Sequence, residues 1–187
     1  MTDTPQGGAA HDVIAARYEG RWAAAMTAII FFLLAIVVFT GLHWASMPTS
    51  RVEAVDPTTL HLKGEFVEDN LGTSVDADGH VTVHLLAQQY AFRPRCLVLP
   101  EDVPVTFRAT SSDVVHGVLV TGTNINTMVV PGYISTFVAT LHGTGERAMP
   151  CHEFCGVGHA AMWARVQVVP KAVFDQLART NRRPGCV

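Results

Sequence analysis

The stretch Pro150-Cys-His-Glu-Phe-Cys-Gly-Val-Gly-His-Ala-Ala-Met162 gathers several metal-binding side chains into one short segment. It holds two cysteines, Cys151 and Cys155, followed by His159 and Met162. Thiolate and thioether sulfur select Cu(I), whereas imidazole binds copper in either oxidation state. A single cysteine would indicate a mononuclear copper site. The second cysteine favours a site that holds more than one copper ion.

Another ligand comes from His116, well upstream of this segment. In a β-sandwich, the loop between the last two strands presents several ligands, and a distant strand supplies one more across its mouth. The predicted ligand set is His116, Cys151, Glu153, Cys155, His159 and Met162. Two thiolates can each bridge two copper ions, and an imidazole can terminate each end. We expect Met162 to act as a weak axial thioether and Glu153 to offer its backbone carbonyl.

In this arrangement the protein fills every ligand position, so no place remains for a substrate. Gly156 and Gly158 let the backbone wrap tightly around the centre. Rigid strands around a copper site also limit its change of geometry between oxidation states. The pattern therefore predicts an electron relay, with no catalytic residue in this chain.

Around the ligand segment, the sequence reads as short strands separated by turn residues from His80 onward. Val81, Val83 and Leu85 alternate onto one face. Strands are expected in the ranges Val81–Tyr90, Cys96–Leu99, Val103–Ala109, Val114–Val120, Ile134–Leu141 and Met162–Val169. This spacing predicts a mainly β domain over residues 80–170, a β-sandwich or Greek-key barrel.

The N-terminal part of the chain contains a long apolar run. From Trp22 to Ser50 there is no Asp, Glu, Lys or Arg, and a spanning helix needs about 20 apolar residues. Trp22 and Trp44 lie at its two ends, where aromatic rings favour the headgroup level. We predict one transmembrane helix over 22–45. A buried core helix would show a polar face, and a cleaved signal peptide would have a shorter apolar region and a small-residue cleavage site.

The other segments are assigned from their composition. Residues 1–21 are expected to be a cytoplasmic tail, 46–79 a linker with some local structure, and 171–187 a C-terminal helix and tail in which Val173, Phe174 and Leu177 share one side. Arg17 and Arg21 give only a slight positive-inside bias. A long C-terminal domain can nevertheless be translocated whatever its charge.

Charge and cysteine content exclude some functions. A net charge of −3 and a pI near 6.3 provide no basic footprint for nucleic acid. Four cysteines are too few for a disulfide framework. Cys96 and Cys186 are left outside the ligand set: they are either a small buried hydrophobe and an exposed tail thiol, or a disulfide.

Residues 80–170 resemble the CuA domain of cytochrome c oxidase subunit II. The resemblance rests on the ligand pattern from Cys151 to Met162 and on three further motifs: Ser112-Asp-Val-Val-His116-Gly, Gly122-Thr-Asn-Ile-Asn126 and Pro131-Gly132. It implies a cupredoxin-like Greek-key sandwich with a dinuclear copper centre. The single preceding helix and the Thr-Asn-Ile-Asn segment are more similar to the ba-type oxidases than to the mitochondrial-like ones.

The resemblance also implies partners and a location. The domain would face the periplasm of a bacterial or archaeal cell membrane, accept electrons from cytochrome c or a small copper protein, and pass them to haem in subunit I for oxygen reduction. The mitochondrial-like family has a tryptophan-rich run where electrons enter, but Leu86–Phe92 has no Trp. Tyr90 and Phe92 are the candidates for a docking surface there.

Four alternatives use the same residues. The chain could be the CuA subunit of a nitric oxide reductase, or a membrane-anchored copper chaperone with a thioredoxin-like cysteine pair. The cluster could be a structural zinc site, although its spacing is unlike that of a zinc finger. Cys151 and Cys155 could also form a disulfide, which would leave the histidines and Met162 unexplained.

Overall fold

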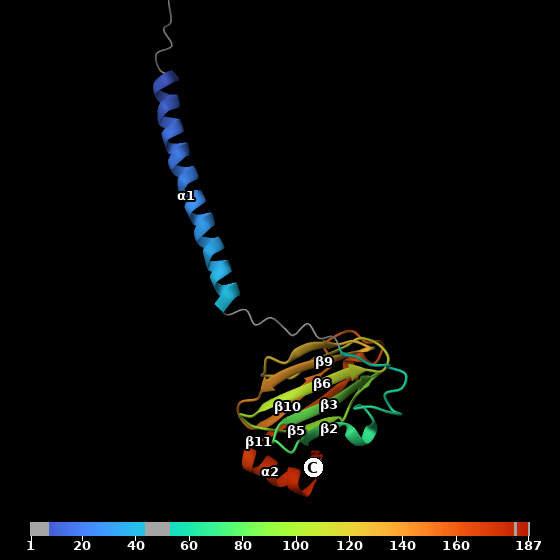
Figure 1. The fold of residues 1–187 in the computed structure, drawn as a ribbon. Helices are drawn as coiled ribbons and strands as arrows, with labels where there is room; N and C mark the ends of the chain where they lie inside the picture. The colour runs from blue at the N-terminus through green and yellow to red at the C-terminus, as the bar shows by residue number, and fades with distance from the viewer. Residues whose placement is uncertain (1–7, 44–52, 182, 187) are drawn as a thin grey trace, which may run out of the picture. The chain divides into compact units, whose positions relative to one another are not determined.

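The computed structural model describes residues 8–43, 53–181 and 183–186 (Figure 1). The chain divides into two compact units, Met1–Ser50 and Arg51–Val187. The first is built around a helix and the second is a β domain. Each is considered by itself.

Helix α1 spans Gly8–His43 and is 36 residues long. Its part from Asp12 to His43 is long and apolar enough to cross a membrane, and its most apolar window is not buried against any other part of the structure. At 1.5 Å per residue, α1 is about 54 Å long, well beyond the roughly 30 Å of a hydrocarbon core. The helix therefore starts earlier than the expected span of 22–45: residues 8–21, assigned above to a tail, continue the same helix. Residues 1–7, 44 and 45 lie outside the described part.

The β domain consists of two sheets and a hairpin. One sheet has the order β1-β9-β6-β3-β2, with β4 also paired to β3; these strands are Glu53–Ala54, Tyr133–Thr140, Pro104–Ser111, Val81–Gln88, Gly72–Val75 and Ala91–Arg93. The second sheet has the order β10-β11-β5, formed by Gly145–Pro150, Trp163–Val169 and Cys96–Pro100. The hairpin joins β7 and β8, which are His116–Leu119 and Asn126–Val129. Two short 3-10 helices, η1 and η2, span Glu68–Asn70 and His159–Ala161.

The core lies where the two sheets face each other. Alternate residues of β3 point inward: Val81, Val83 and Leu85 are at most 4% exposed. The neighbouring strand β6 and strand β11 of the other sheet follow the same period-two pattern and bury Phe107 and Val166. Both β3–β6 and β5–β11 pair in parallel, so the chain crosses over between its two sheets. The prediction of a mainly β, cupredoxin-like sandwich behind one N-terminal apolar helix is confirmed.

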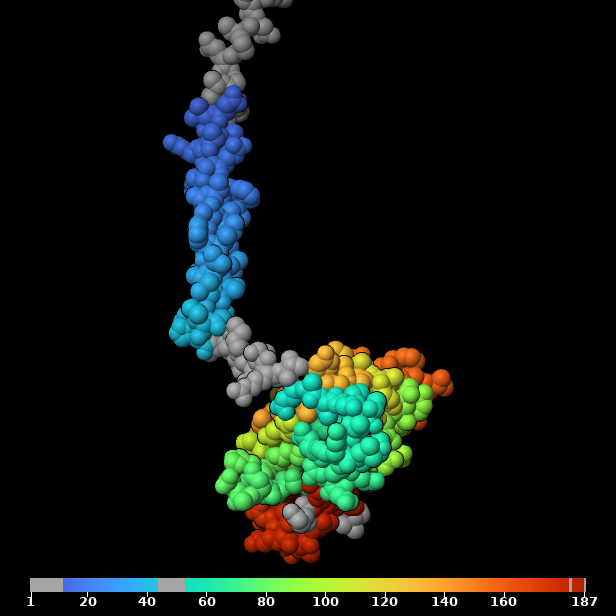
Figure 2. All heavy atoms as spheres, turned by 45° about the vertical axis from the view of Figure 1, so that its right-hand side comes forward, coloured from blue at the N-terminus to red at the C-terminus, as the bar shows by residue number. Residues whose placement is uncertain are grey.

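Much of the segment assigned above to a linker belongs to the domain. β1 pairs with β9, β2 pairs with β3, and Leu60 and Phe66 are 2% and 1% exposed. These two side chains pack with Leu86 in a small second apolar cluster. In Figure 2, the blue-green residues that follow the grey trace are spread over one face of the domain. Burying these two large apolar side chains attaches the segment to the domain. Each burial stabilises the folded state by roughly 1.5–3 kcal/mol. Residues 46–52 lie outside the described part.

The C-terminal end is also fastened to the domain. Helix α2 spans Lys171–Thr180, as predicted, and buries Phe174 with Leu177 packed partly beside it. Val173, expected on the same side, is 44% exposed.

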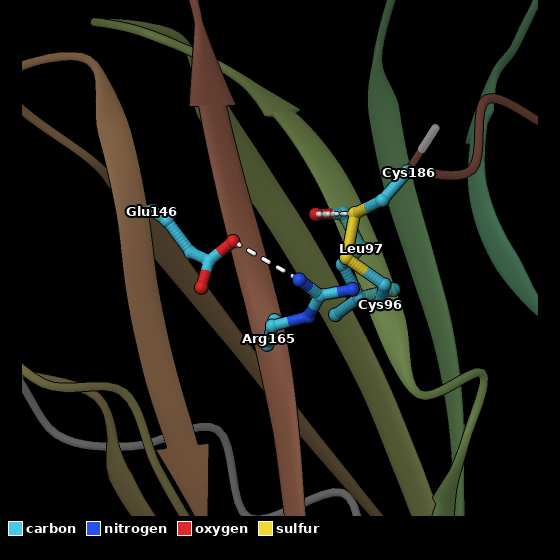
Figure 3. Close-up of a disulfide and its surroundings, with 5 residues drawn as sticks. All are labelled: Cys96, Leu97, Glu146, Arg165 and Cys186. Carbon is cyan, nitrogen blue, oxygen red and sulfur yellow. Dashed lines mark hydrogen bonds and ion pairs between the residues drawn. A yellow bond between two sulfur atoms is a disulfide. The ribbon is translucent and has the colours of Figure 1, made fainter.

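Beyond α2 the tail returns to the sheet, where a disulfide joins Cys186 to Cys96 at the start of β5 (Figure 3). The two Cα atoms are 5.8 Å apart and 90 residues separate the cysteines in sequence. The bond lies beside the ion pair between Arg165 and Glu146. Of the two alternatives for these cysteines, the structure has the disulfide and not the separate thiols.

Candidate metal centre

The ligand loop, defined here as residues 151–162, joins β10 to β11. The backbone N–H of Cys151 donates to the carbonyl of Met162 at 2.9 Å, which closes the base of the loop. Next to it, the N–H of His152 donates to the carbonyl of Gly117 at 3.0 Å and fastens the loop to β7. Gly117 leaves room for this contact, because a β-carbon there would lie 2.8 Å from the backbone nitrogen of Glu153. His116, the first residue of β7, is thereby held beside the loop.

The sulfur and nitrogen donors form a series. The Sγ atoms of Cys151 and Cys155 are 3.8 Å apart and are not bonded to each other. The Nδ1 atom of His116 lies 3.8 Å from Cys151 Sγ, and that of His159 lies 3.6 Å from Cys155 Sγ. Each thiol therefore has its own imidazole.

Two weaker donors complete the group. The carbonyl oxygen of Glu153 lies 3.2 Å from Cys151 Sγ, and the thioether sulfur of Met162 lies 3.7 Å from Cys155 Sγ. All six residues predicted from the sequence are thus brought together, and the Glu153 atom that lies beside Cys151 Sγ is its backbone carbonyl oxygen. His152, within the loop but not among the predicted ligands, is exposed.

The separations between donors suit shared metal ions. Metal–sulfur bonds of about 2.3 Å and metal–nitrogen bonds of about 2.0 Å, at near-tetrahedral angles, place two donors of one ion roughly 3.5–3.8 Å apart. The four sulfur–sulfur and sulfur–nitrogen separations between neighbouring donors fall within or near this range. The donor set of two thiols, two imidazoles and a thioether is soft, as copper prefers. The residues therefore fit copper.

Four of the six residues are buried, whereas Glu153 and His159 are half-buried. His116 and Met162 are 0% exposed, and Cys151 and Cys155 are 7% and 5% exposed. Burial, with the neighbouring Cys151 as the next cause, raises the pKa of the Cys155 thiol to about 11. A metal that binds as a thiolate complex must displace this proton.

Asp113 orients the distant ligand. Its Oδ1 atom lies 2.8 Å from Nε2 of His116. A carboxylate only accepts hydrogen bonds, so Nε2 carries the proton and Nδ1 presents its lone pair toward the cysteines. Burial would raise the pKa of Asp113, but hydrogen bonds from the Gln89 N–H and from His116 hold it below its usual range.

Asp113 also caps the turn before His116. It does so by accepting from the N–H of Val114 at 2.7 Å, and it binds His116 as well. Its position three residues before a ligand histidine is the signal that could have revealed the second role.

Comparison with known proteins agrees with this geometry. The family model described as cytochrome c oxidase subunit II, periplasmic domain, matches residues 82–169. Cytochrome c oxidase subunit 2 of a Thermus thermophilus strain is 35% identical over 161 residues, covering 85% of this chain and 95% of the relative. The chain belongs to the cytochrome c oxidase subunit II family. A second subunit 2 sequence from Thermus thermophilus is 34% identical over 122 residues, 65% of this chain and 90% of the relative.

A solved structure extends the likeness. A heme-copper terminal oxidase dimer determined by cryo-EM contains a chain that superposes with a TM-score of 0.53 and 29% identity, over 82% of this chain and 99% of that chain. As a subunit II, the chain is a membrane-anchored part of a haem–copper oxidase that partners subunit I, and copper is the metal that its family supports. These matches do not favour the nitric oxide reductase or copper chaperone alternatives.

Proposed function

We propose that this chain is the electron-entry subunit of its oxidase, with a dinuclear CuA centre held by the six residues above. One observation carries the proposal: two buried thiols 3.8 Å apart each have their own imidazole and their own weak donor. A mononuclear blue-copper site would use only one thiol. The symmetric donor set therefore suits two ions bridged by both sulfurs.

The protein's part in this function is to hold the ligands still and to exclude water. Copper supplies reversible one-electron chemistry when bound. Cys151 and Cys155 would bridge, His116 and His159 would terminate, and Met162 and the Glu153 carbonyl would act as weak ligands. Asp113 fixes the tautomer of His116, and the strands fix the loop at both of its ends. Because the protein fills the ligand positions, the centre would relay electrons without binding a substrate.

The electron donor and acceptor follow from the same proposal. Electrons would come from cytochrome c or a small copper protein and would pass to haem in subunit I, where oxygen is reduced. No reaction would take place on this chain itself.

We place the domain on the outer, periplasmic side of a bacterial or archaeal cell membrane, with α1 as a single-pass anchor. The disulfide between Cys96 and Cys186 supports this side. Disulfides persist in oxidising compartments such as the periplasm and are rare in the cytosol.

Copper loading of the full chain in detergent tests the proposal. We expect two copper ions per chain by metal analysis, and an electron paramagnetic resonance spectrum with one unpaired electron shared by two copper nuclei. A matched pair of variants locates the centre: His159→Ala should lose this spectrum, whereas His152→Ala, at an exposed position of the same loop, should keep it. A single-copper spectrum from the unaltered chain would refute the dinuclear centre.

A further inference from the structure

Gln89 lies in the turn between β3 and β4 and makes two hydrogen bonds toward the metal centre. Its side-chain Nε2 donates to the carbonyl oxygen of Cys155 at 2.5 Å. Its backbone N–H donates to Oδ2 of Asp113 at 2.6 Å. The other oxygen of Asp113 binds His116. One residue thus connects the ligand loop to the ligand that comes from a distant strand.

We propose that Gln89 is a positioning residue of the metal centre, which fixes Cys155 relative to His116 through these two hydrogen bonds. The inference rests on the proposed function, in that the centre is taken to hold copper. It concerns how this chain positions the ligands and adds no ligand to the set.

The backbone of the ligand loop is conformationally permissive next to Cys155, so a hydrogen bond from outside the loop is needed to fix it. Gly156, directly after Cys155, has φ of +128°, a conformation that glycine adopts freely and other residues rarely do. The peptide that carries the Cys155 carbonyl therefore adjoins the most permissive residue type. A hydrogen bond from outside the loop restricts its rotation, and with it the direction of the Cys155 side chain.

The contact requires a hydrogen-bond donor at position 89, which the amide of Gln89 supplies. A carbonyl oxygen only accepts hydrogen bonds, so only the NH₂ group of Gln89 can satisfy it. A carboxylate of the same shape would place a second acceptor against the carbonyl. The bond from the backbone N–H to Asp113 is assisted by the carboxylate charge, which makes it stronger than a neutral one.

Packing of the next residue shows independently how closely this turn lies on the loop. A β-carbon on Gly158 would lie 2.5 Å from Cδ2 of Tyr90, and one on Gly156 would lie 2.6 Å from Tyr90 Oη and 2.9 Å from Gln89 Nε2. No side chain fits between the turn and the loop. The two glycines therefore allow residues 89 and 90 to press directly on the segment between Cys155 and His159.

Copper release measures the positioning role directly. The full chain in detergent is loaded with copper and mixed with excess chelator, and the decay of the two-copper spectrum is followed for Gln89→Glu, Gln89→Ala and Gln88→Glu. Loss of an outer partner of a metal ligand typically costs 10–100-fold in metal affinity, so we expect about 10-fold faster release for Gln89→Glu and a smaller increase for Gln89→Ala. Gln88→Glu makes the same chemical change one residue earlier and should release copper at the unaltered rate.

Two further readouts separate positioning from folding. Without copper, thermal melting of the Gln89 variants should match that of Gln88→Glu; with copper, the hyperfine pattern should change only in the Gln89 variants. If Gln89→Glu does not fold, Gln89→Ala carries the test alone. Equal release rates and identical spectra for the position-89 and position-88 variants would overturn the inference and leave the proposed function standing. An unaltered chain that never yields the two-copper spectrum would instead overturn the proposed function itself.

Discussion

The ligand loop and the two wrapping segments, residues 53–79 and 171–186, reach their places on the sandwich by opposite means. The loop collects most of its donors from one short stretch, and its base is closed by neighbouring strands. The wrapping segments are held by partners far away in sequence: a disulfide to Cys96 for one and hydrogen bonds to Arg108 for the other. Local spacing therefore determines the site, and distant pairing determines how the surrounding domain is closed.

The two cysteine pairs show the difference in its simplest form. Cys151 and Cys155 are four residues apart, are buried and are not bonded to each other, and an imidazole lies beside each sulfur. Cys96 and Cys186 are 90 residues apart and are bonded to each other. Closeness in sequence places the first pair in one loop, where we propose that it shares copper, and closeness only in the fold allows the covalent bond in the second pair.

The largest effect is expected when the first pair is broken. Cys155→Ser removes one of the two thiols, and a hydroxyl is a poor ligand for copper, so the dinuclear centre and electron entry should be lost. Copper analysis, the resonance spectrum and oxygen uptake by the assembled oxidase measure this. The double variant Cys96→Ser/Cys186→Ser is the matched control, because it removes the other pair and should keep both copper ions. Normal turnover of the Cys155→Ser oxidase would contradict the assignment.

Breaking the second pair should affect stability without affecting the metal. A disulfide typically contributes about 2–4 kcal/mol by restricting the unfolded chain. We expect Cys96→Ser/Cys186→Ser to lower the free energy of unfolding of the β domain by that amount, measured by urea denaturation of the full chain in detergent.

A reductant supplies the control for this loss. It should bring the unaltered domain to the stability of the double variant and leave the variant unchanged. Equal stability of the unaltered domain with and without reductant would show that the tail is held by packing alone.

Particular residues show what the sequence could and could not predict. The strand face of Val81, Val83 and Leu85 and helix α2 depend on local periodicity, and they were predicted in place. Five of the six proposed ligands come from one short stretch of sequence, whereas His116 joins them only through the fold. β1 has two residues and no period to read, and it forms because β9 offers a partner edge. The role of Gln89 could not be predicted either, because its partners Cys155 and Asp113 become its neighbours only in the fold.

A smaller change within the centre distinguishes bridging from weak ligands. Met162→Leu removes the thioether but keeps the volume of a fully buried side chain, so stability should change by less than about 1.5 kcal/mol. Both copper ions should remain bound. The reduction potential should rise, because the oxidised centre loses an electron-donating ligand. Redox titration of the loaded chain measures the shift.

Met149 provides the matched control for that substitution. It is equally buried but lies on β10 outside the donor set, so Met149→Leu should leave the potential unchanged. Loss of copper from Met162→Leu, or equal potentials in the two variants, would contradict the weak axial role.

The smallest effect concerns the ion pairs that hold the N-terminal wrapping segment. Arg108 on β6 donates to Glu65 and to Glu53, and Nε2 of His84 lies 3.1 Å from Glu65. Hydrogen bonds from Arg108 hold the pKa of Glu65 below its usual range. The Glu65 carboxylate therefore stabilises the domain fully above its unfolded pKa of about 4.3, and this contribution is lost as pH falls through the lower folded pKa.

Glu65→Gln should consequently cost about 1 kcal/mol at neutral pH, and the difference from the unaltered domain should shrink below about pH 4. Urea denaturation across pH 3–8 measures both quantities. Glu146→Gln makes the same change in the more exposed pair with Arg165, where we expect no more than about 0.5 kcal/mol because solvent screens the charges. If the two variants lost equal stability, or if the Glu65→Gln difference did not depend on pH, this attachment would owe nothing to the half-buried Glu65 carboxylate. Leu60 and Phe66 would then hold the segment chiefly by apolar packing, with Glu53–Arg108 and Glu68–Arg93 as its remaining ion pairs.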